Sequence, residues 1–378
     1  MPSTPAQSSP VPAMNTISAD WALRMANDRQ SLQRRDTENF LRALTVQTYA
    51  QRAARWPRDY SSLPAYAASV ASLRAEWAEC VGIFNLTAQT DQAVLTPYCE
   101  TDAFTAYWLV APMTLGEHAD ATAQPGPLIH ARAILALPKH RPGPYQLVIA
   151  QHGIGCSPER VFGMVDDGNL YHSYGRRLAE AGYAVLAPIH ITEHQPRARL
   201  QRMCLMLGKT LWGLEIGKLK ALLDVALSRP DIRPDGTAMW GISLGGAYTM
   251  FTSVLEERIQ AAICTAWFND RLNKMIIDDP RYSCFLSTTE EHIFIPGWLR
   301  NFGDSDLISL ICPRPMLIQS GRGDSISWWP QLQTEFSVAH SHYAHLGLHD
   351  KLEMILHDGG HEIDVPSGIA FLAKHMAP

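Results

Sequence analysis

The chain has 378 residues, of which 46% are hydrophobic and 18% are charged, a composition typical of a globular protein with a large core. Its formal net charge of −5 and its lack of a dense Lys/Arg cluster argue against a nucleic-acid-binding surface. No apolar run reaches the roughly 18 residues that a membrane span needs, and the N-terminus has no secretory-signal pattern.

The N-terminal quarter of the chain is predicted to consist of a tail and a helical extension. Residues 1–13 are rich in Pro, Ser and Ala without periodicity, which predicts a disordered tail. The extension is predicted at 14–103, and within it residues from about 18 to 81 carry apolar side chains at helical spacing, with breaks at Pro57 and Pro64. We expect two or three helices here that pack on the body as a scaffold or as a partial lid.

Residues 104–378 are predicted to form one α/β catalytic domain. Helical patterns at 170–181 and 197–228 alternate with later strand-like runs, and a last helix is expected at 367–375. This alternation predicts a mostly parallel, eight-stranded sheet with helices on both faces. An aromatic-rich insertion at about 268–312 could cover the carboxyl ends of the strands. The eight predicted strands are 104–112, 130–138, 146–150, 183–188, 237–240, 261–266, 315–320 and 352–357.

A sharp turn follows the predicted strand at 237–240. It reads Gly241-Ile-Ser-Leu-Gly245, the G-x-S-x-G spacing, and an apolar helical segment comes after it. A serine at the tip of such a turn is strained, so the residues two before and two after it have to be small. The turn lifts the hydroxyl above the sheet, where the amides of the new helix point. Ser243 is therefore the predicted nucleophile.

A serine hydroxyl is a weak nucleophile and needs a base that an acid orients. In a sheet of this kind the partners follow later strands in the order Ser, Asp or Glu, His. Asp324 lies in the loop after one late strand, and His361 lies in the loop after the last one. Asp350 and Asp358 are alternative acids, but Asp324 is preferred because it follows a strand. The predicted triad is Ser243, Asp324 and His361.

The reaction also needs donors for the oxyanion that forms on the attacked carbonyl. One predicted donor is the backbone amide of Leu244, the residue after the nucleophile. The second should come from the loop 151–155, where Ile154 is preferred and Gly153 is the alternative. His152 in the same loop is interpreted as a structural residue that holds the loop in place.

These motifs resemble the α/β-hydrolase superfamily, and within it the dienelactone-hydrolase-like and acetyl-xylan-esterase-like carboxylesterases. The resemblance runs from about residue 104 to the C-terminus, and it implies ester hydrolysis through an acyl-enzyme with the three triad residues in the family's roles. Two departures leave the substrate open: two tryptophans precede Pro330, and the Arg-Gly-Gln oxyanion signature is absent. The matching segments are Gln151-His-Gly-Ile-Gly155, Ser228-Arg-Pro-Asp-Ile232, Trp240-Gly-Ile-Ser-Leu-Gly-Gly246, the run 304–315 and Gly360-His-Glu362.

Aromatic residues near the predicted triad are candidates for substrate binding. Trp328 and Trp329 follow the acid, and Trp267 and Phe268 follow a strand whose end faces the site. Trp298, in the insertion, could form part of a hydrophobic roof. For each of them, packing in the core is the alternative interpretation.

No cofactor and no metal is predicted. His345 and His349 have an i, i+4 spacing that a metal could use, but no acidic motif accompanies them, so a solvated helix face is favoured. The seven cysteines are dispersed without a C-x-x-C pair, which favours reduced thiols and a cytoplasmic location.

The predicted function is hydrolysis of a small or medium acyl ester, with a sugar acetate and an aromatic ester as the two substrate classes considered. The expected partner is a small-molecule ester, and the oligomeric state is left open. Two other functions are compatible with the sequence: an amidase or peptidase of the same fold, and a non-catalytic binding protein on a hydrolase scaffold.

Overall fold

The computed structural model describes residues 14–116, 127–166 and 170–376, so the tail predicted at 1–13 lies outside the described residues. The chain forms two compact units, divided between Gln51 and Arg52. In the first unit, α1 (Ala19–Gln51) is a 33-residue helix whose apolar side chains are mostly exposed; Phe40, for example, is 64% exposed. The only other described element of this unit is a short 3-10 helix, so α1 has no partner there that could bury an apolar face.

The second unit contains the sheet and the remaining helices. Its strands are β1 (Leu86–Ala88), β2 (Val94–Glu100), β3 (Phe104–Leu115), β4 (Ile129–Pro138), β5 (Tyr145–Gln151), β6 (Ala184–Pro188), β7 (Ile232–Ile242), β8 (Ile259–Thr265), β9 (Met316–Gly321) and β10 (Leu352–His357). Its α-helices are α2 (Leu63–Val81), α3 (Pro158–Val161), α4 (Tyr174–Glu180), α5 (His194–Leu205), α6 (Leu211–Leu227), α7 (Leu244–Leu255), α8 (Arg271–Ile276), α9 (Trp298–Asn301), α10 (Asp304–Ile311), α11 (Trp329–Ala344) and α12 (Val365–His375).

The strands form one sheet in the order β1-β3-β4-β6-β5-β7-β8-β9-β10, with β2 also paired to β3. The six strands from β6 to β10 in this order run parallel, and the strands at the other edge run antiparallel. The mostly parallel sheet is thus confirmed. The predicted count of eight strands is wrong, because β1 and β2 precede the first predicted strand. Most β2 side chains are exposed, so that strand carries little of the apolar pattern that marks the others.

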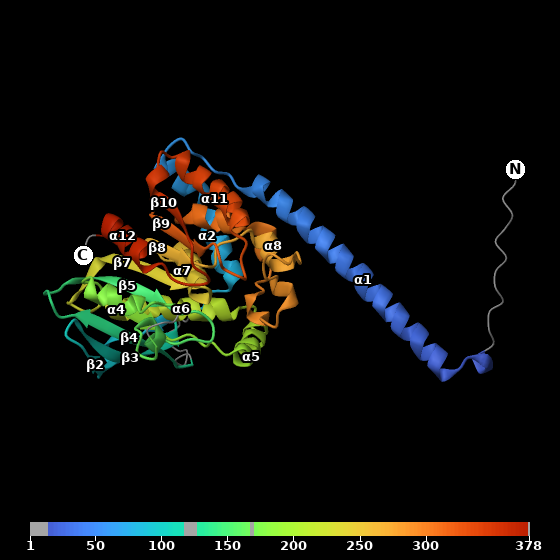
Figure 1. Cartoon of the computed structure of the whole chain (residues 1–378), viewed down its shortest axis with the longest axis horizontal. Helices are drawn as coiled ribbons and strands as arrows, with labels where there is room; N and C mark the ends of the chain where they lie inside the picture. The colour runs from blue at the N-terminus through green and yellow to red at the C-terminus, as the bar shows by residue number, and fades with distance from the viewer. Residues whose placement is uncertain (1–13, 117–126, 167–169, 377–378) are drawn as a thin grey trace, which may run out of the picture. The chain divides into compact units, whose positions relative to one another are not determined.

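Helices cover both faces of the sheet (Figure 1). Every residue of β5 is buried, which explains its continuous apolar sequence. Val148 and Ala150 pack in a cluster with α4 and α12, whereas Leu147 and Ile149 pack in a cluster with α6 on the opposite face. A third cluster joins α6 to α2, α7, α10 and α11. The carboxyl ends of the parallel strands are left for the connecting loops, which carry the predicted site.

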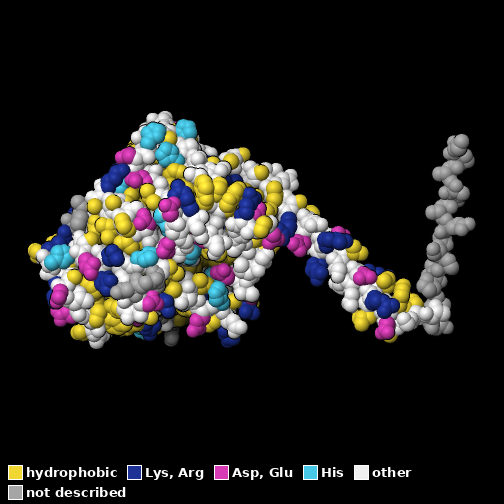
Figure 2. All heavy atoms as spheres, viewed as in Figure 1, with side chains coloured by type: hydrophobic (Ala, Val, Ile, Leu, Met, Phe, Trp, Pro, Cys, Tyr) yellow, Lys and Arg dark blue, Asp and Glu magenta, His cyan; other side chains and the backbone are white. Residues whose placement is uncertain are grey.

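The surface has mixed charge where the view displays it. Figure 2 shows basic and acidic side chains interspersed on the visible face of the second unit. Within the described part of the chain, no helix combines the length and the apolar character that crossing a membrane requires.

Candidate active site

Ser243 occupies the sharp turn between β7 and α7. Its backbone has φ 57° and ψ −120°, a conformation that side-chain-bearing residues rarely adopt. The Ser243 amide donates a hydrogen bond to the Thr265 carbonyl, at 2.9 Å, which ties the turn to the neighbouring strand β8. Strain of this kind costs about 1–3 kcal/mol and persists only where the surroundings hold it, often at functional sites.

The glycines of the turn are required because backbone atoms surround them. A Cβ at Gly241 would collide with the Gly245 carbonyl. A Cβ at Gly245 would lie 2.6 Å from the Gln151 carbonyl oxygen and 2.8 Å from that of His152. These contacts bring the serine turn against the loop after β5, which is the predicted source of an oxyanion donor.

We expect Gly245→Ala to destabilise the protein by about 1–3 kcal/mol, because the added methyl group would press on two backbone carbonyls that cannot rotate away. The measurement is chemical denaturation followed by circular dichroism. Gly208→Ala is the control: a Cβ there meets nothing within 4 Å, so only its φ of 66° costs stability, about 1 kcal/mol. Equal or smaller destabilisation by Gly245→Ala would contradict the close packing of the turn.

Asp324 and His361 form a hydrogen-bonded pair between the loops after β9 and β10. His361 Nδ1 lies 2.7 Å from Asp324 Oδ2, and the aspartate side chain is fully buried while that of the histidine is 25% exposed. The other carboxylate oxygen, Oδ1, accepts from the Ile326 amide at 3.0 Å. The structure therefore pairs His361 with Asp324, whereas Asp358 is almost fully exposed and pairs with Arg322.

The pKa of Asp324 reflects two opposing effects. Burial raises it, but the hydrogen bond and charge of His361, the Ile326 amide and the charge of Lys274 outweigh burial and lower it below the ordinary value. The aspartate therefore stays ionised at neutral pH. An ionised acceptor at His361 Nδ1 keeps a proton on that nitrogen and leaves Nε2 free to accept one.

Within the described residues, no hydrogen bond joins Ser243 Oγ to His361. The serine turn and the loop that follows Asp324 instead line one cavity, whose described lining includes neither Asp324 nor His361. Ser243 lines it, and so do Ile326 and Ser327 from the loop that Asp324 begins. Hydrogen bonds between a catalytic serine and its base are often long in ligand-free enzymes and tighten in the complex with substrate.

The loop after β5 lies beside Ser243, since a Cβ at Gly153 would be 3.4 Å from the serine Cβ. The Gly153 amide donates to the Tyr171 hydroxyl at 2.8 Å, so this amide is already engaged. Ile154, by contrast, lines the cavity together with Ser243 and Leu244. Of the two loop amides that the sequence offers as oxyanion donors, the geometry therefore favours Ile154.

His152 holds this loop from inside the protein. It is fully buried, and burial lowers its pKa to about 4, so the ring is neutral. Its Nε2 accepts from the His190 amide at 3.2 Å, which leaves the proton on Nδ1 to donate to the Gly153 carbonyl at 3.0 Å. Both nitrogens are thus engaged in backbone contacts, in line with a structural residue.

The cavity at Ser243 has a volume of about 290 Å³ and a mixed lining. Half of its residues belong to the insertion 268–312, which therefore forms a wall of the site. Apolar walls come from Trp267, Phe285 and Ile293. The polar lining residues besides Ser243 are Asn269, Lys274, Ser283, Thr288, Glu290 and Ser327.

The five aromatic candidates for substrate binding occupy different places. Trp267 lines the cavity and is 8% exposed. Phe268 and Trp298 are buried in the core, where Trp298 packs edge-on against Phe251, so neither is among the cavity's lining residues in the described structure. Trp328 and Trp329 are half-buried at the start of α11, and the Arg281 guanidinium lies 3.8 Å over the Trp328 ring. Of the five, Trp267 alone is among the described lining residues of the cavity.

The charged residues of the cavity were not predicted. Lys274 is buried, its Nζ donates to the Ile326 carbonyl at 2.6 Å, and burial lowers its pKa to about 8. Glu290 faces the same cavity, and burial raises its pKa. The sequence around Lys274, Asp270-Arg-Leu-Asn-Lys-Met-Ile276, is mostly polar and gave no signal that this lysine would be buried.

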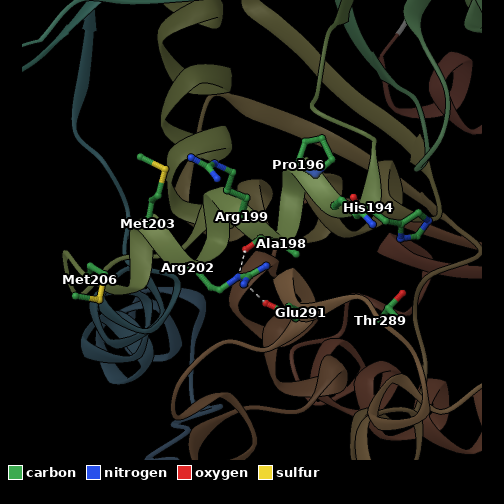
Figure 3. Close-up of a pocket in the computed structure, with 10 residues that line it drawn as sticks. His194, Pro196, Ala198, Arg199, Arg202, Met203, Met206, Thr289 and Glu291 are labelled. Carbon is green, nitrogen blue, oxygen red and sulfur yellow. Dashed lines mark hydrogen bonds and ion pairs between the residues drawn. The ribbon is translucent and has the colours of Figure 1, made fainter.

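A second, larger cleft of about 900 Å³ lies between α5 and residues 289–291 (Figure 3). The Arg202 guanidinium pairs across it with the Glu291 carboxylate at 3.2 Å. Thr289 and Glu291 line this cleft, whereas their neighbours Thr288 and Glu290 line the serine cavity, so one segment separates the two spaces. The described lining of this cleft includes no member of the predicted triad.

The strand order, the serine turn and the Asp–His pair at the carboxyl ends of the strands define an α/β-hydrolase fold. The resemblance inferred from the sequence is thereby confirmed at the level of the fold.

Comparisons with known proteins agree. A provisionally assigned acetyl xylan esterase from Bacteroides fragilis NCTC 9343 matches with a TM-score of 0.59 and 16% identity, covering 80% of this chain and 78% of that one. A carbohydrate esterase family 15 glucuronoyl esterase from Caldicellulosiruptor kristjansonii matches with a TM-score of 0.58 and 17% identity, covering 83% of this chain and 86% of that one.

One curated relative also matches in sequence. The chain is 28% identical over 204 residues to YtaP, a provisionally assigned hydrolase of Bacillus subtilis (strain 168). The match covers 52% of this chain and 66% of YtaP, so the chain spans just under two thirds of that relative's length. No protein-family model matches the sequence.

Proposed function

We propose that this protein is a serine carboxylesterase that works through an acyl-enzyme, with Ser243 as nucleophile, His361 as general base and then acid, and Asp324 as the residue that orients it. The observation that carries the proposal is the part-buried hydrogen bond of 2.7 Å between Asp324 and His361, two residues from separate loops at the same sheet edge as the strained serine. A purely structural serine turn would not require such a pair at the same edge of the sheet.

The proposed reaction has two halves. Ser243 Oγ attacks the ester carbonyl while His361 Nε2 takes its proton, and the amides of Leu244 and Ile154 donate to the oxyanion. The tetrahedral intermediate then collapses, the C–O bond to the alcohol breaks, and His361 returns the proton to the leaving oxygen. A water molecule repeats the sequence on the acyl-enzyme, releasing the carboxylic acid and restoring Ser243.

The substrate that we propose is a small or medium acyl ester of a sugar. A volume of about 290 Å³ accommodates a small group but not a long alkyl chain. The ammonium of Lys274 and the carboxylate of Glu290 on the cavity wall can form hydrogen bonds with the hydroxyl groups of a sugar. A purely aromatic group would offer these two side chains no such bonds. Fold neighbours named as acetyl xylan and glucuronoyl esterases support this choice over the aromatic ester.

A fluorophosphonate reagent tests the proposal, because it forms a bond only with an activated serine. We expect one equivalent to attach to the protein, with tandem mass spectrometry locating it on Ser243. In parallel, turnover of 4-nitrophenyl acetate should exceed turnover of 4-nitroacetanilide by at least about a hundredfold, since the anilide is the poorer leaving group.

The outcomes separate the competing functions. Labelling of Ser243 with comparable turnover of ester and anilide would favour the amidase or peptidase alternative. No labelling of the folded protein, together with no ester turnover, would favour a non-catalytic binding protein on the same scaffold. Labelling elsewhere in the chain would remove Ser243 from the mechanism.

A further inference from the structure

Residues 170–173, just ahead of α4, contact both loops that the proposed mechanism uses. We call them the bridging segment. On one side they reach the loop 152–155, which carries the oxyanion donor proposed at Ile154. On the other side they reach the loop 358–363, which carries His361. These contacts are made by side chains and backbone, and they come from an element that contributes no group to the reaction itself.

The first contact is made by Tyr171. Its hydroxyl accepts the Gly153 amide proton at 2.8 Å, and the side chain is 1% exposed. Burial and the neighbouring Cys156 thiol raise the pKa of Tyr171, so the hydroxyl stays protonated. The bond fixes the peptide plane before Gly153, and His152 Nδ1 holds the Gly153 carbonyl, which lies in the same peptide plane as the Ile154 amide, at 3.0 Å. With both planes held, the Ile154 amide is fixed relative to Tyr171.

The second set of contacts reaches the loop of His361. The Ile363 amide donates to the Leu170 carbonyl at 2.9 Å, and His172 Nε2 lies 2.7 Å from Glu362 Oε2. The other carboxylate oxygen of Glu362 accepts from the Gly360 amide at 2.9 Å. Residues on both sides of His361 are therefore held by Glu362 and by the bridging segment, independently of the bond from Asp324.

The backbone of the segment is strained where these contacts are made. His172 and Ser173 have φ angles of 48° and 52°, in the left-handed region that favours glycine. Each such residue costs about 1–3 kcal/mol and is retained when the surroundings hold it. The Arg177 guanidinium donates to the His172 carbonyl at 3.1 Å and supports this conformation. The left-handed turn lets Tyr171 and His172 point their side chains toward two different loops.

Resting on the proposed function, we propose that the bridging segment is a positioning element that fixes the oxyanion donor relative to the base, with Tyr171 and Glu362 as its two positioning residues. Neither touches the reacting atoms. Both act through a neighbour: Tyr171 through the Ile154 amide, and Glu362 through the imidazole of His361. Because both loops contact the bridging segment, removing its contact with one loop also loosens the other loop.

If Tyr171 served packing alone, Tyr171→Phe would lower stability without lowering kcat. Tyr183 provides the comparison, since it too is 1% exposed and its hydroxyl donates one hydrogen bond to a backbone carbonyl, that of Met376, at 2.9 Å. It belongs to the same hydrophobic cluster as Tyr171, and its hydrogen bonds go to Met376 and Leu178, which lie outside both loops of the site. Tyr171→Phe and Tyr183→Phe remove the same atom from equally buried rings, so they should lower stability by similar amounts.

The experiment measures kcat and KM for 4-nitrophenyl acetate in Tyr171→Phe, Glu362→Ala, Glu362→Gln and the double variant, with Tyr183→Phe as control. We expect kcat to fall by about tenfold in Tyr171→Phe and by ten- to a hundredfold in Glu362→Ala, with KM within twofold, because misplacement by about 1 Å costs up to a hundredfold in rate. Glu362→Gln keeps an acceptor for the Gly360 amide and should recover part of the loss. Tyr183→Phe should match wild type.

The double variant tests the coupling. Two changes that loosen one shared element should cost less together than the product of their separate effects, whereas Tyr183→Phe combined with Glu362→Ala should multiply. Multiplicative losses for Tyr171→Phe with Glu362→Ala, a kcat within twofold of wild type in either single variant, or a change confined to KM would overturn the proposal. Wild-type and Ser243→Ala rates are measured first, so that absent or serine-independent turnover counts against the esterase and not against the bridging segment.

Discussion

Ser243→Ala is expected to lower kcat for 4-nitrophenyl acetate by about 10⁴- to 10⁶-fold while the protein stays folded. The alanine cannot form the acyl-enzyme, so only the oxyanion donors and substrate binding would still accelerate the reaction. The measurement is steady-state turnover at saturating ester, with the circular dichroism spectrum and melting temperature of each variant recorded alongside. Ser253→Ala is the matched control, because Ser253 is a buried serine on α7, the helix that follows the serine turn, and its loss should leave kcat unchanged.

A glycine at the same position separates strain from chemistry. Ser243 has a φ of 57°, which glycine adopts without steric cost. Ser243→Gly should therefore be as inactive as the alanine variant, yet more stable than wild type by about 1 kcal/mol. An unchanged or lower free energy of unfolding would mean that the turn stores no strain. Turnover by Ser243→Ala at a rate near that of wild type would end the assignment of the nucleophile.

The parts of the fold that could be predicted depend on local patterns. β5 is buried along its whole length, so its apolar run is visible in the sequence. The serine turn is visible because its glycines contact one another and the adjacent loop, which demands small residues at fixed spacing. The order of Asp324 and His361 after late strands follows from the topology of a parallel sheet.

Glycines show where local patterns stop being sufficient. The helical pattern at 197–228 contains Gly208 and Gly213, and the structure breaks it at Gly208, which has a φ of 66°. Gly213 remains inside α6, where a Cβ would collide with the Gly82 carbonyl. One glycine is needed for its backbone angle and the other for close approach of a distant segment. The two requirements look alike in a sequence.

The composition of the cavity was out of reach for the same reason. Lys274 and Glu290 face Ser243 only because the insertion folds back over the strand ends, and no short-range pattern specifies that path. Likewise, the Gly153 amide is occupied by a hydroxyl 18 residues away. The aromatic candidates show the opposite case, a residue predicted at the site that lies elsewhere. Trp298 belongs to the insertion that forms a wall of the cavity, but its side chain packs against Phe251 in the core.

Asp324→Asn is expected to lower kcat by about 10⁴-fold with little change in KM, because it should reverse the tautomer of His361. The direction of the asparagine amide follows from its two neighbours. The Ile326 amide donates to one oxygen of Asp324, so the asparagine keeps its carbonyl there and turns its NH₂ group toward His361 Nδ1. That nitrogen must then accept, which moves the proton to Nε2, the atom that has to take the proton from Ser243.

Asp358→Asn is the control for the alternative acid. Asp358 is exposed and pairs with Arg322, so its loss should change kcat by less than twofold. A heteronuclear NMR spectrum of the imidazole nitrogens would check the tautomer directly: wild type should carry the proton on Nδ1 of His361 and Asp324→Asn on Nε2. If Asp324→Asn retained near wild-type turnover while Asp358→Asn lost it, the acid would be Asp358. The hydrogen bond between Asp324 and His361 would then be a structural contact, because the catalytic acid is the residue that sets the tautomer of the histidine.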